Sequence, residues 1–246
     1  MDHRQVTPKG PNRQSRQVIM LDHRPTVLLT RPQAQAERFA QALRDVPVVI
    51  SPLMRIEQQP LDVDLTGYRG LVFTSENGVL ACPVCTLPAY CVGDRTAQAA
   101  RAAGMRAVSA KGSADDLVRL IVDRAIEGPL LHVRGEHTRG GVVGKLHALG
   151  IQVDEVVGYQ QIAQPLNQQA RELLGGESIV ILPLFSPRTA RLFVVDVGRI
   201  GAHVRVVAIS DAVKAALAGS GLSDITVAKA PDAKGMIAAI QGRIDA

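Results

Sequence analysis

Short runs rich in valine, isoleucine and leucine alternate with amphipathic helical patterns along most of the chain. A strand buried on both faces needs a near-continuous apolar run, whereas a helix that covers a sheet needs only an apolar stripe. Their alternation is typical of parallel sheets with helices on both faces. The predicted strands are residues 26–30, 46–50, 71–74, 89–92, 106–109, 130–133, 178–182, 204–209 and 225–228.

Helical patterns follow these strands, and one longer segment interrupts the alternation. The segment over residues 151–162 reads as extended and contains Gly158. Its 246 residues give the chain room for two α/β domains of roughly 110 residues each. The sequence therefore predicts two doubly wound parallel-sheet domains rather than one barrel. The clearest helical patterns cover residues 34–43, 168–174, 187–196, 212–218 and 233–241.

Much of the basic excess of the chain is concentrated near its amino terminus. The formal net charge is +5, and residues 1–24 contribute +3 of it from five basic and two acidic side chains. This segment has no apolar periodicity, so we expect it to be a disordered extension. Aromatic residues make up 3% of the chain and tryptophan is absent. A nucleic-acid surface would combine clustered basic residues with stacking aromatics, so we expect no nucleic-acid partner.

Neither a membrane nor an oxidising compartment is indicated. No apolar run approaches the roughly 18 residues that a spanning helix needs, and the polar amino terminus has no signal-peptide core. Three cysteines, Cys82, Cys85 and Cys91, are too few for a disulfide framework. The Cys-Pro-Val-Cys spacing lacks further ligands nearby, so we interpret these cysteines as packing residues. We expect a cytoplasmic protein without a metal.

Hydroxyl-bearing residues recur where a predicted strand ends and a helix begins. Ser75 and Thr96 occupy such positions in one half of the chain, and Ser186 and Ser210 do so in the other. Ligands of open α/β sheets bind at the carboxyl ends of the strands, and helix amino termini favour anions. Simple N-capping explains any one of these residues. Their repetition favours a cleft that binds carboxylates or phosphates.

Eight segments together resemble one known family. They are residues 29–32, 73–79, 92–97, 112–117, 132–136, Tyr159, residues 185–187 and residues 228–231. In their order, spacing and secondary-structure placement, the chain resembles the uroporphyrinogen-III synthase family over nearly all of residues 27–244. Each segment alone is a weak signal, but together they are fairly specific.

The resemblance implies a discontinuous architecture with the active cleft between the domains. Domain one would consist of residues 25–50 and 164–246, and domain two of residues 55–156. Two extended crossings, residues 51–54 and 157–163, would join the two domains.

The resemblance also implies an activity. Members of the family cyclise hydroxymethylbilane, a linear tetrapyrrole, with inversion of its last pyrrole ring and loss of water. The reaction passes through azafulvene and spiro intermediates, belongs to haem biosynthesis and needs no cofactor. We therefore expect a lyase that receives its substrate from hydroxymethylbilane synthase. We also expect a monomer, because the sequence has no coiled-coil pattern.

The resemblance assigns roles to individual residues. Tyr159 matches a family tyrosine that is proposed to assist departure of the substrate hydroxyl, and a phenol is protonated at neutral pH. Packing against the crossing is the alternative role for this residue. Arg205 could pair with a carboxylate or could be a solvated surface residue. The predicted substrate-binding residues are Thr30, Arg31, Ser75, Asn77, Thr96, Ser186 and Arg205.

Three positions depart from the family pattern. Asp94 and Asp211 stand where proline is common, and Val213 replaces a hydroxyl residue. We expect both aspartates to cap their own helices, which would keep their charge away from an anionic substrate. A non-catalytic anion-binding protein, or a degenerate paralogue that keeps only the fold, remains an alternative function.

Overall fold

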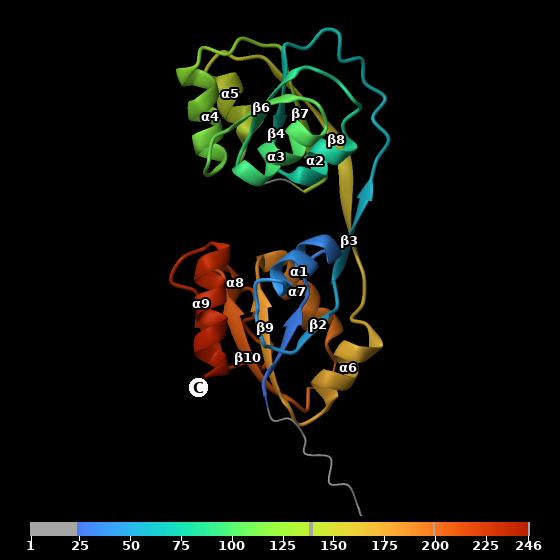
Figure 1. The fold of residues 1–246 in the computed structure, drawn as a ribbon, viewed down its shortest axis with the longest axis vertical. Coiled ribbons are helices and arrows are strands. Elements are labelled where there is room, and N and C mark those ends of the chain that lie inside the picture. Colours follow the sequence, from blue (N-terminus) through green and yellow to red (C-terminus); the bar gives the residue numbers. More distant parts are fainter. Residues whose placement is uncertain (1–23, 138–139, 199, 246) are drawn as a thin grey trace, which may run out of the picture.

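The computed structural model describes residues 24–137, 140–198 and 200–245. The predicted disorder of residues 1–24 therefore falls almost entirely outside the described residues. The described chain forms two α/β lobes, each with its own mainly parallel sheet (Figure 1). This arrangement confirms the predicted fold class. No helix in the described part of the chain is both long enough and apolar enough to cross a membrane.

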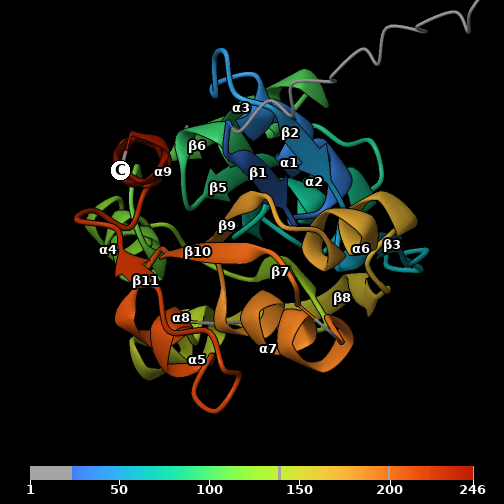
Figure 2. The same cartoon turned by 90° about the horizontal axis from the view of Figure 1, so that it is seen from below.

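Lobe one contains a five-stranded parallel sheet in the order β11-β10-β9-β1-β2. Its strands are β1 (Thr26–Leu29), β2 (Val48–Ile50), β9 (Ile179–Leu184), β10 (His203–Ala208) and β11 (Ile225–Val227). Its helices are α1 (Gln33–Ala40), α6 (Gln168–Gly175), α7 (Pro187–Asp196), α8 (Asp211–Ala215) and α9 (Ala233–Ile244). Helices α1 and α9 cover one face through buried residues such as Phe39 and Met236. Helices α6, α7 and α8 cover the other face, which Phe193 helps to fill (Figure 2).

Lobe two contains a six-stranded sheet in the order β3-β8-β7-β4-β5-β6. Its strands are β3 (Met54–Gln58), β4 (Gly70–Phe73), β5 (Pro88–Cys91), β6 (Arg106–Ser109), β7 (Leu130–Gly135) and β8 (Val153–Ala163). Its helices are α2 (Glu76–Ala81), α3 (Asp94–Ala102), α4 (Ala114–Asp123) and α5 (Val142–Ala148). Val79 of α2 and Ala97 of α3 pack on one face, and Leu117 of α4 and Leu146 of α5 pack on the other. Each sheet is thus buried on both faces, as its apolar strands require.

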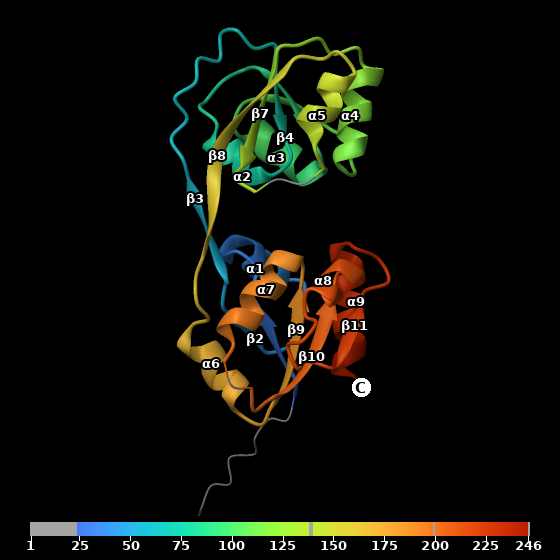
Figure 3. The same cartoon turned by 180° about the vertical axis from the view of Figure 1, so that it is seen from behind.

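The lobes are joined by an antiparallel ladder between β3 and β8, which runs along one side of the molecule (Figures 1 and 3). The first part of β8 pairs with β7, and the β7 pairing ends where Gly135 meets Tyr159. From Tyr159 to Ala163 the strand pairs with β3. The extended stretch predicted over residues 151–162 corresponds to β8. Strand β3 is not among the strands predicted from the sequence.

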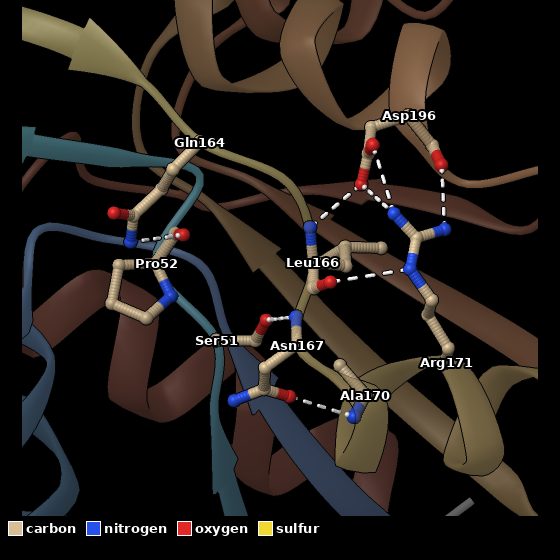
Figure 4. Close-up of polar contacts among 8 residues, drawn as sticks. All are labelled: Ser51, Pro52, Gln164, Leu166, Asn167, Ala170, Arg171 and Asp196. Carbon is tan, nitrogen blue, oxygen red and sulfur yellow. Dashed lines mark hydrogen bonds and ion pairs between the residues drawn. The ribbon is translucent and has the colours of Figure 1, made fainter.

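A polar network anchors both connections in lobe one (Figure 4). The Gln164 side chain donates to the carbonyl of Pro52 at 2.8 Å, and the backbone N–H of Asn167 donates to Ser51 Oγ at 2.9 Å. The two connections are therefore bonded to each other as they enter the lobe. The Asp196 carboxylate accepts the backbone N–H of Leu166 at 2.7 Å and a guanidinium N–H from Arg171 at 2.9 Å.

The cysteines pack as apolar side chains of lobe two, in agreement with the interpretation of the sequence. Cys91 ends β5 in the fully buried core, and Cys82 and Cys85 are partly buried against it. Burial raises the pKa of both Cys82 and Cys91 to about 12, so these thiols are protonated at neutral pH. Within residues 24–137, 140–198 and 200–245, no three His, Cys, Asp or Glu side chains gather into a metal-binding group.

Candidate functional site

The strand order of lobe one reverses between β1 and β9. From β1 the chain continues outward to β2, whereas from β9 it continues to β10 on the other side. A crevice opens where two neighbouring strands send their connections in opposite directions, and this is where such sheets bind ligands. Thr30 and Arg31 follow β1, and Phe185 and Ser186 follow β9. These four residues therefore mark the binding edge of lobe one.

Lobe two has the same feature between β4 and β7. Strand β4 leads to β5 on one side, and β7 leads to β8 on the other. Thr74 and Ser75 follow β4, while Gly135 ends β7 and is followed closely by His137. The second sheet therefore has its own binding edge at these residues.

Both binding edges open onto one cavity of about 370 Å³. Met54, Tyr159 and Gln161 of the connecting strands also line it. The cavity is therefore built from both lobes and from the ladder between them. Its lining residues are Arg31, Pro32, Gln35, Met54, Thr74, Ser75, Gly135, His137, Tyr159, Gln161, Phe185, Ser186, Arg188 and Thr189.

The charge of this cavity is positive. Arg31 and Arg188 line it, and no Asp or Glu is among its described lining residues. The Arg31 guanidinium carbon lies 4.0 Å from the centroid of the Phe185 ring, and its Nη2 donates to Gln35 Oε1 at 3.2 Å. Burial, followed by the positive charges of Arg95 and Arg38, lowers the pKa of Arg31 to about 10. The group is still charged at neutral pH, so an anionic ligand would relieve its unfavourable surroundings.

Arg188 ties lobe one to the connecting ladder. It lies in the first turn of α7, and its Nη2 donates to the carbonyl of Gln161 at 2.8 Å. Arg188 also lines the cavity, and a guanidinium carries five N–H donors, so this one bond does not use its full donor capacity. Arg188 therefore holds the backbone of the ladder and also places a positive charge at the cavity.

Two further cavities extend the site and share residues with the first. One of about 410 Å³ contains Asn77 and Glu76 together with Gln35 and Met54. The other, of about 370 Å³, contains Arg31, Arg38 and Arg95 between α1, α9 and the start of α3. An ion pair between Arg38 of α1 and Glu76 of α2 joins the lobes beside these cavities. Gln35 lines all three cavities, which therefore lie next to one another.

Tyr159 lies where β8 leaves β7, and its side chain is 6% exposed. Its ring lies against the backbone of Gly135, where any side chain would collide with it. The residue nevertheless lines the cavity. Its phenol is thus held by packing at the junction of both lobes, which is compatible with both roles considered from the sequence.

Ser75 and Ser186 line the cavity and also cap helices. Ser75 Oγ accepts the backbone N–H of Asn77 at 3.2 Å, and Ser186 Oγ accepts that of Thr189 at 3.1 Å. The capping role considered from the sequence is therefore present at both positions. A capping hydroxyl keeps its own hydrogen, so Ser75 can still donate one hydrogen bond. Ser186 Oγ also lies 2.9 Å from Oγ1 of Thr189, and either hydroxyl can be the donor in that pair.

The structure does not bring every predicted binding residue to the cavity. Thr30 is fully buried, and Thr96 is 6% exposed within the first turn of α3. Neither is among the lining residues, whereas Asn77 lines only the second cavity. Arg205 lies apart from the others: its Nη1 donates to the carbonyl of Arg243 at 2.7 Å. It lines a cavity of about 740 Å³ at the amino ends of β9 and β10, the opposite end from the strand termini that bind ligands.

The expected capping roles of Asp94 and Asp211 are wrong. Gly93 and Ser210 occupy the cap positions, and each aspartate is the first residue inside its helix. Both aspartates are exposed, and there a negative charge interacts favourably with the helix dipole. Val213 is fully buried in the core of lobe one, where an apolar residue is favourable.

Several cavity residues were not singled out from the sequence. Gly135 and Gln161 depend on the junction of β7, β8 and β3, which no local pattern reveals. Thr74 and Arg188 had a usable signal, because Thr74 directly precedes Ser75 and Arg188 lies two positions after Ser186. A candidate region from one residue before each such serine to one helical turn after it would include both.

The fold and this cavity define a class of two-lobed α/β proteins with an arginine-lined cleft between two doubly wound sheets. A similar solved structure is uroporphyrinogen-III synthetase from Helicobacter pylori 26695, which is 17% identical with a TM-score of 0.64. The likeness covers 89% of this chain and 99% of that chain, and at this identity it shows the fold. A mutant uroporphyrinogen III synthase from the extremely thermophilic bacterium Thermus thermophilus is 14% identical, covering 90% of this chain and 99% of its own, with a TM-score of 0.49.

No curated protein matches the sequence. The family model described as uroporphyrinogen-III synthase HemD matches residues 37–238. The chain therefore belongs to the uroporphyrinogen-III synthase family, whose enzymes act in tetrapyrrole and haem biosynthesis.

Proposed function

We propose that this protein is a lyase that cyclises hydroxymethylbilane to uroporphyrinogen III. The observation that carries the proposal is the shared cavity: the ligand-binding edges of two sheets face it, with Arg31 and Arg188 and no carboxylate among its described lining residues. Hydroxymethylbilane is a flexible chain of four pyrroles bearing acetate and propionate groups. Its negative charges suit the arginines, and its rings suit apolar side chains such as Phe185 and Met54.

The proposed reaction draws its driving force from the substrate. A pyrrole nitrogen supplies the electron pair that expels the terminal hydroxyl, which leaves with a proton as water and produces an azafulvene. The substituted carbon of the last ring attacks this electrophile and forms a spiro intermediate. The bond from that carbon to its original methylene bridge then breaks, which leaves an azafulvene on the neighbouring ring. The unsubstituted carbon of the last ring attacks this azafulvene, so the ring closes in the inverted orientation. The last ring loses its proton, which restores the pyrrole.

The protein's part in this proposal is mainly to position the chain. Without constraint, the unsubstituted carbon of the last ring closes directly and gives the type I isomer. Arg31, Arg188 and the helix N–H groups beside Ser75 and Ser186 would hold the carboxylates, so that spiro closure is faster. The Tyr159 hydroxyl would donate its hydrogen to the departing oxygen.

Closure of the lobes would complete the site. We propose that residues 25–50 with 164–246, and residues 55–156, move as two domains about the crossings at 51–54 and 157–163. Two separate sheets joined by a narrow ladder support such a hinge. Small-angle scattering with and without tetrapyrrole would test it, and an unchanged radius of gyration at saturation would contradict closure.

The decisive experiment supplies freshly generated hydroxymethylbilane, oxidises the products and separates the type I and type III porphyrins. We expect type III with the protein and type I in its absence. Type I alone in both reactions would reject the proposal and leave the non-catalytic anion-binding alternative.

We further propose a cytoplasmic monomer that takes its substrate directly from hydroxymethylbilane synthase. Light scattering should give a mass near the 26.2 kDa of one chain. Under direct transfer, excess inactive hydroxymethylbilane synthase should slow conversion, because it competes with the active synthase for the surface that receives the substrate. No effect would argue against direct transfer.

A further inference from the structure

A buried histidine lies directly behind the cavity wall. His132 occupies the middle of β7 and is 3% exposed. Successive strand residues point to opposite faces, so His132 shares the face of Leu130 and lies among the apolar residues that α4 and α5 cover. Its Nε2 lies 3.2 Å from Oγ1 of Thr74, which lines the cavity. One hydroxyl therefore separates the imidazole from the ligand space.

The other imidazole nitrogen is unpaired. Nδ1 of His132 is buried, and it has no hydrogen-bond partner among the residues that the structure describes. Burial, the largest effect, lowers the pKa of His132 to about 4. Glu155, opposite it on β8, acts to raise that pKa, and Arg134 acts to lower it. The ring is therefore neutral at pH 7 and carries one hydrogen, on either Nδ1 or Nε2.

The two neutral tautomers have different consequences for Thr74. With the hydrogen on Nδ1, a buried N–H would have no acceptor, and the Thr74 hydroxyl would have to point its hydrogen back at Nε2. With the hydrogen on Nε2, the imidazole donates to Thr74 Oγ1, and only a lone pair on Nδ1 is left unpaired. Orphaned buried N–H groups are the rarer of the two in folded proteins. The second tautomer is therefore favoured.

We propose that His132, as the Nε2–H tautomer, is a positioning residue that aims the Thr74 hydroxyl hydrogen into the cavity. Because Nε2–H occupies one lone pair of Oγ1, the hydroxyl hydrogen is directed away from the ring. Thr74 then presents a fixed donor, which would bind a substrate carboxylate alongside Arg31. This inference rests on the proposed function, since the tetrapyrrole supplies that carboxylate.

The tautomer can be measured directly on the free protein. In ¹⁵N-histidine-labelled protein at pH 7, we expect the His132 resonances to show a protonated Nε2 and an unprotonated Nδ1, with assignment by loss of the signals in His132→Gln. A protonated Nδ1 would overturn the inference. This readout needs no substrate and tests the tautomer alone.

Kinetics tests the donor itself. Thr74→Val keeps the shape but removes the hydroxyl, and we expect its KM to rise about tenfold with a much smaller change in kcat. His132→Gln retains a donor near the Nε2 position and should stay within about threefold of the wild type. His132→Asn is too short to reach Thr74 and should resemble Thr74→Val.

The control is His147→Gln, because His147 Nε2 accepts the backbone N–H of Val153 at 3.3 Å and does not line the cavity. Its KM should be unchanged. Normal type III production by the wild type together with an unchanged KM for Thr74→Val would overturn this inference alone. A wild-type protein that yields only type I would remove the proposed function, and with it the carboxylate role of Thr74.

Discussion

Gly135 and Tyr159 face each other across β7 and β8, and the tyrosine ring occupies the space where a side chain at residue 135 would lie. A Cβ atom built on Gly135 would come within 2.7 Å of Cε2 and Cζ of Tyr159 and within 3.0 Å of its hydroxyl oxygen. A Cβ atom essentially never comes within 3.0 Å of a non-bonded heavy atom. The tyrosine ring or the backbone beside it must therefore shift if this glycine is replaced.

Gly135→Ala should therefore displace the phenol and lower kcat about tenfold or more in the isomer assay. Gly144→Ala is the matched control, because Gly144 lies in α5 with no atom within 4 Å of the added Cβ. It should leave turnover unchanged and stabilise the protein by roughly 0.5–1 kcal/mol through helix propensity. Equal turnover in the two variants would refute the link between Gly135 and Tyr159.

Tyr159→Phe should slow turnover substantially while the fold stays intact. The change removes only the hydroxyl and keeps the ring that packs on Gly135. Loss of a general acid typically costs 10²- to 10⁴-fold in rate, so a decrease of about a hundredfold is expected. Single-turnover kinetics and a thermal melt measure the two effects. If the rate is unchanged, Tyr159 has only the packing role.

Arg31→Met should raise KM by about tenfold or more. Methionine can retain apolar contact with Phe185 but cannot pair with a carboxylate, and charged hydrogen bonds contribute about 1.5–3 kcal/mol. Arg205→Met is the comparison, since Arg205 lines the cavity at the far end of the same sheet. Its KM should not change, and a similar increase in both variants would count against the assignment of Arg31 to the substrate.

Ser186 allows capping to be separated from substrate binding. Ser186→Ala should destabilise the protein by about 1 kcal/mol, and Ser186→Gly by only a few tenths, because glycine is tolerated at an N-cap. If backbone N–H groups bind the carboxylate, both variants should keep a KM near that of the wild type. A KM that rises equally in both would show instead that the serine hydroxyl binds the substrate.

The pKa of His132 predicts an acid-sensitive contribution to stability. The pKa is lowered from 6.5 to about 4 in the folded chain, so between these pH values the unfolded chain binds a proton that the folded chain does not. The free energy of unfolding should therefore fall as the pH drops from about 7 to about 4, with about 3 kcal/mol coming from this residue.

Urea unfolding of the wild type and His132→Gln across this pH range measures the contribution. The variant should lose less stability towards pH 4, because it has no imidazole to protonate. Carboxylates remote from His132 titrate alike in both proteins and cancel in the difference, whereas Glu155, opposite His132 on β8, does not cancel completely. Two parallel stability curves would show that His132 does not carry the effect.

The sequence predicts the two doubly wound sheets well because the central strands are largely buried and therefore mainly apolar, namely β1, β4, β5, β7, β9 and β10. Strand β3, which the sequence does not predict, lacks this apolar signal. It reads Met54-Arg55-Ile56-Glu57-Gln58, it lies at a sheet edge, and only Met54 is buried. Its pairing partner β8, rather than its own composition, makes it a strand.

The candidate site was predictable where it depends on strand ends and not where it depends on how the lobes meet. Ser75, Ser186 and Arg31 follow apolar strands and do line the cavity. Arg205 could have been rejected on the same reasoning, since it lies in the third position of β10, before the carboxyl end. Gly135 is different, because its importance comes from the Tyr159 ring on a neighbouring strand.

The chain order of the five-stranded sheet affects how the protein can fold as it is synthesised. β1 must be made first but has β9 as one of its two neighbours, and β9 begins only at Ile179. All six strands of the other sheet are complete once Ala163 has been added. On the ribosome, the six-stranded sheet can therefore fold before β9, the neighbour of β1, has been synthesised. The strand of the five-stranded sheet that is made first is thus among the last to reach its final environment.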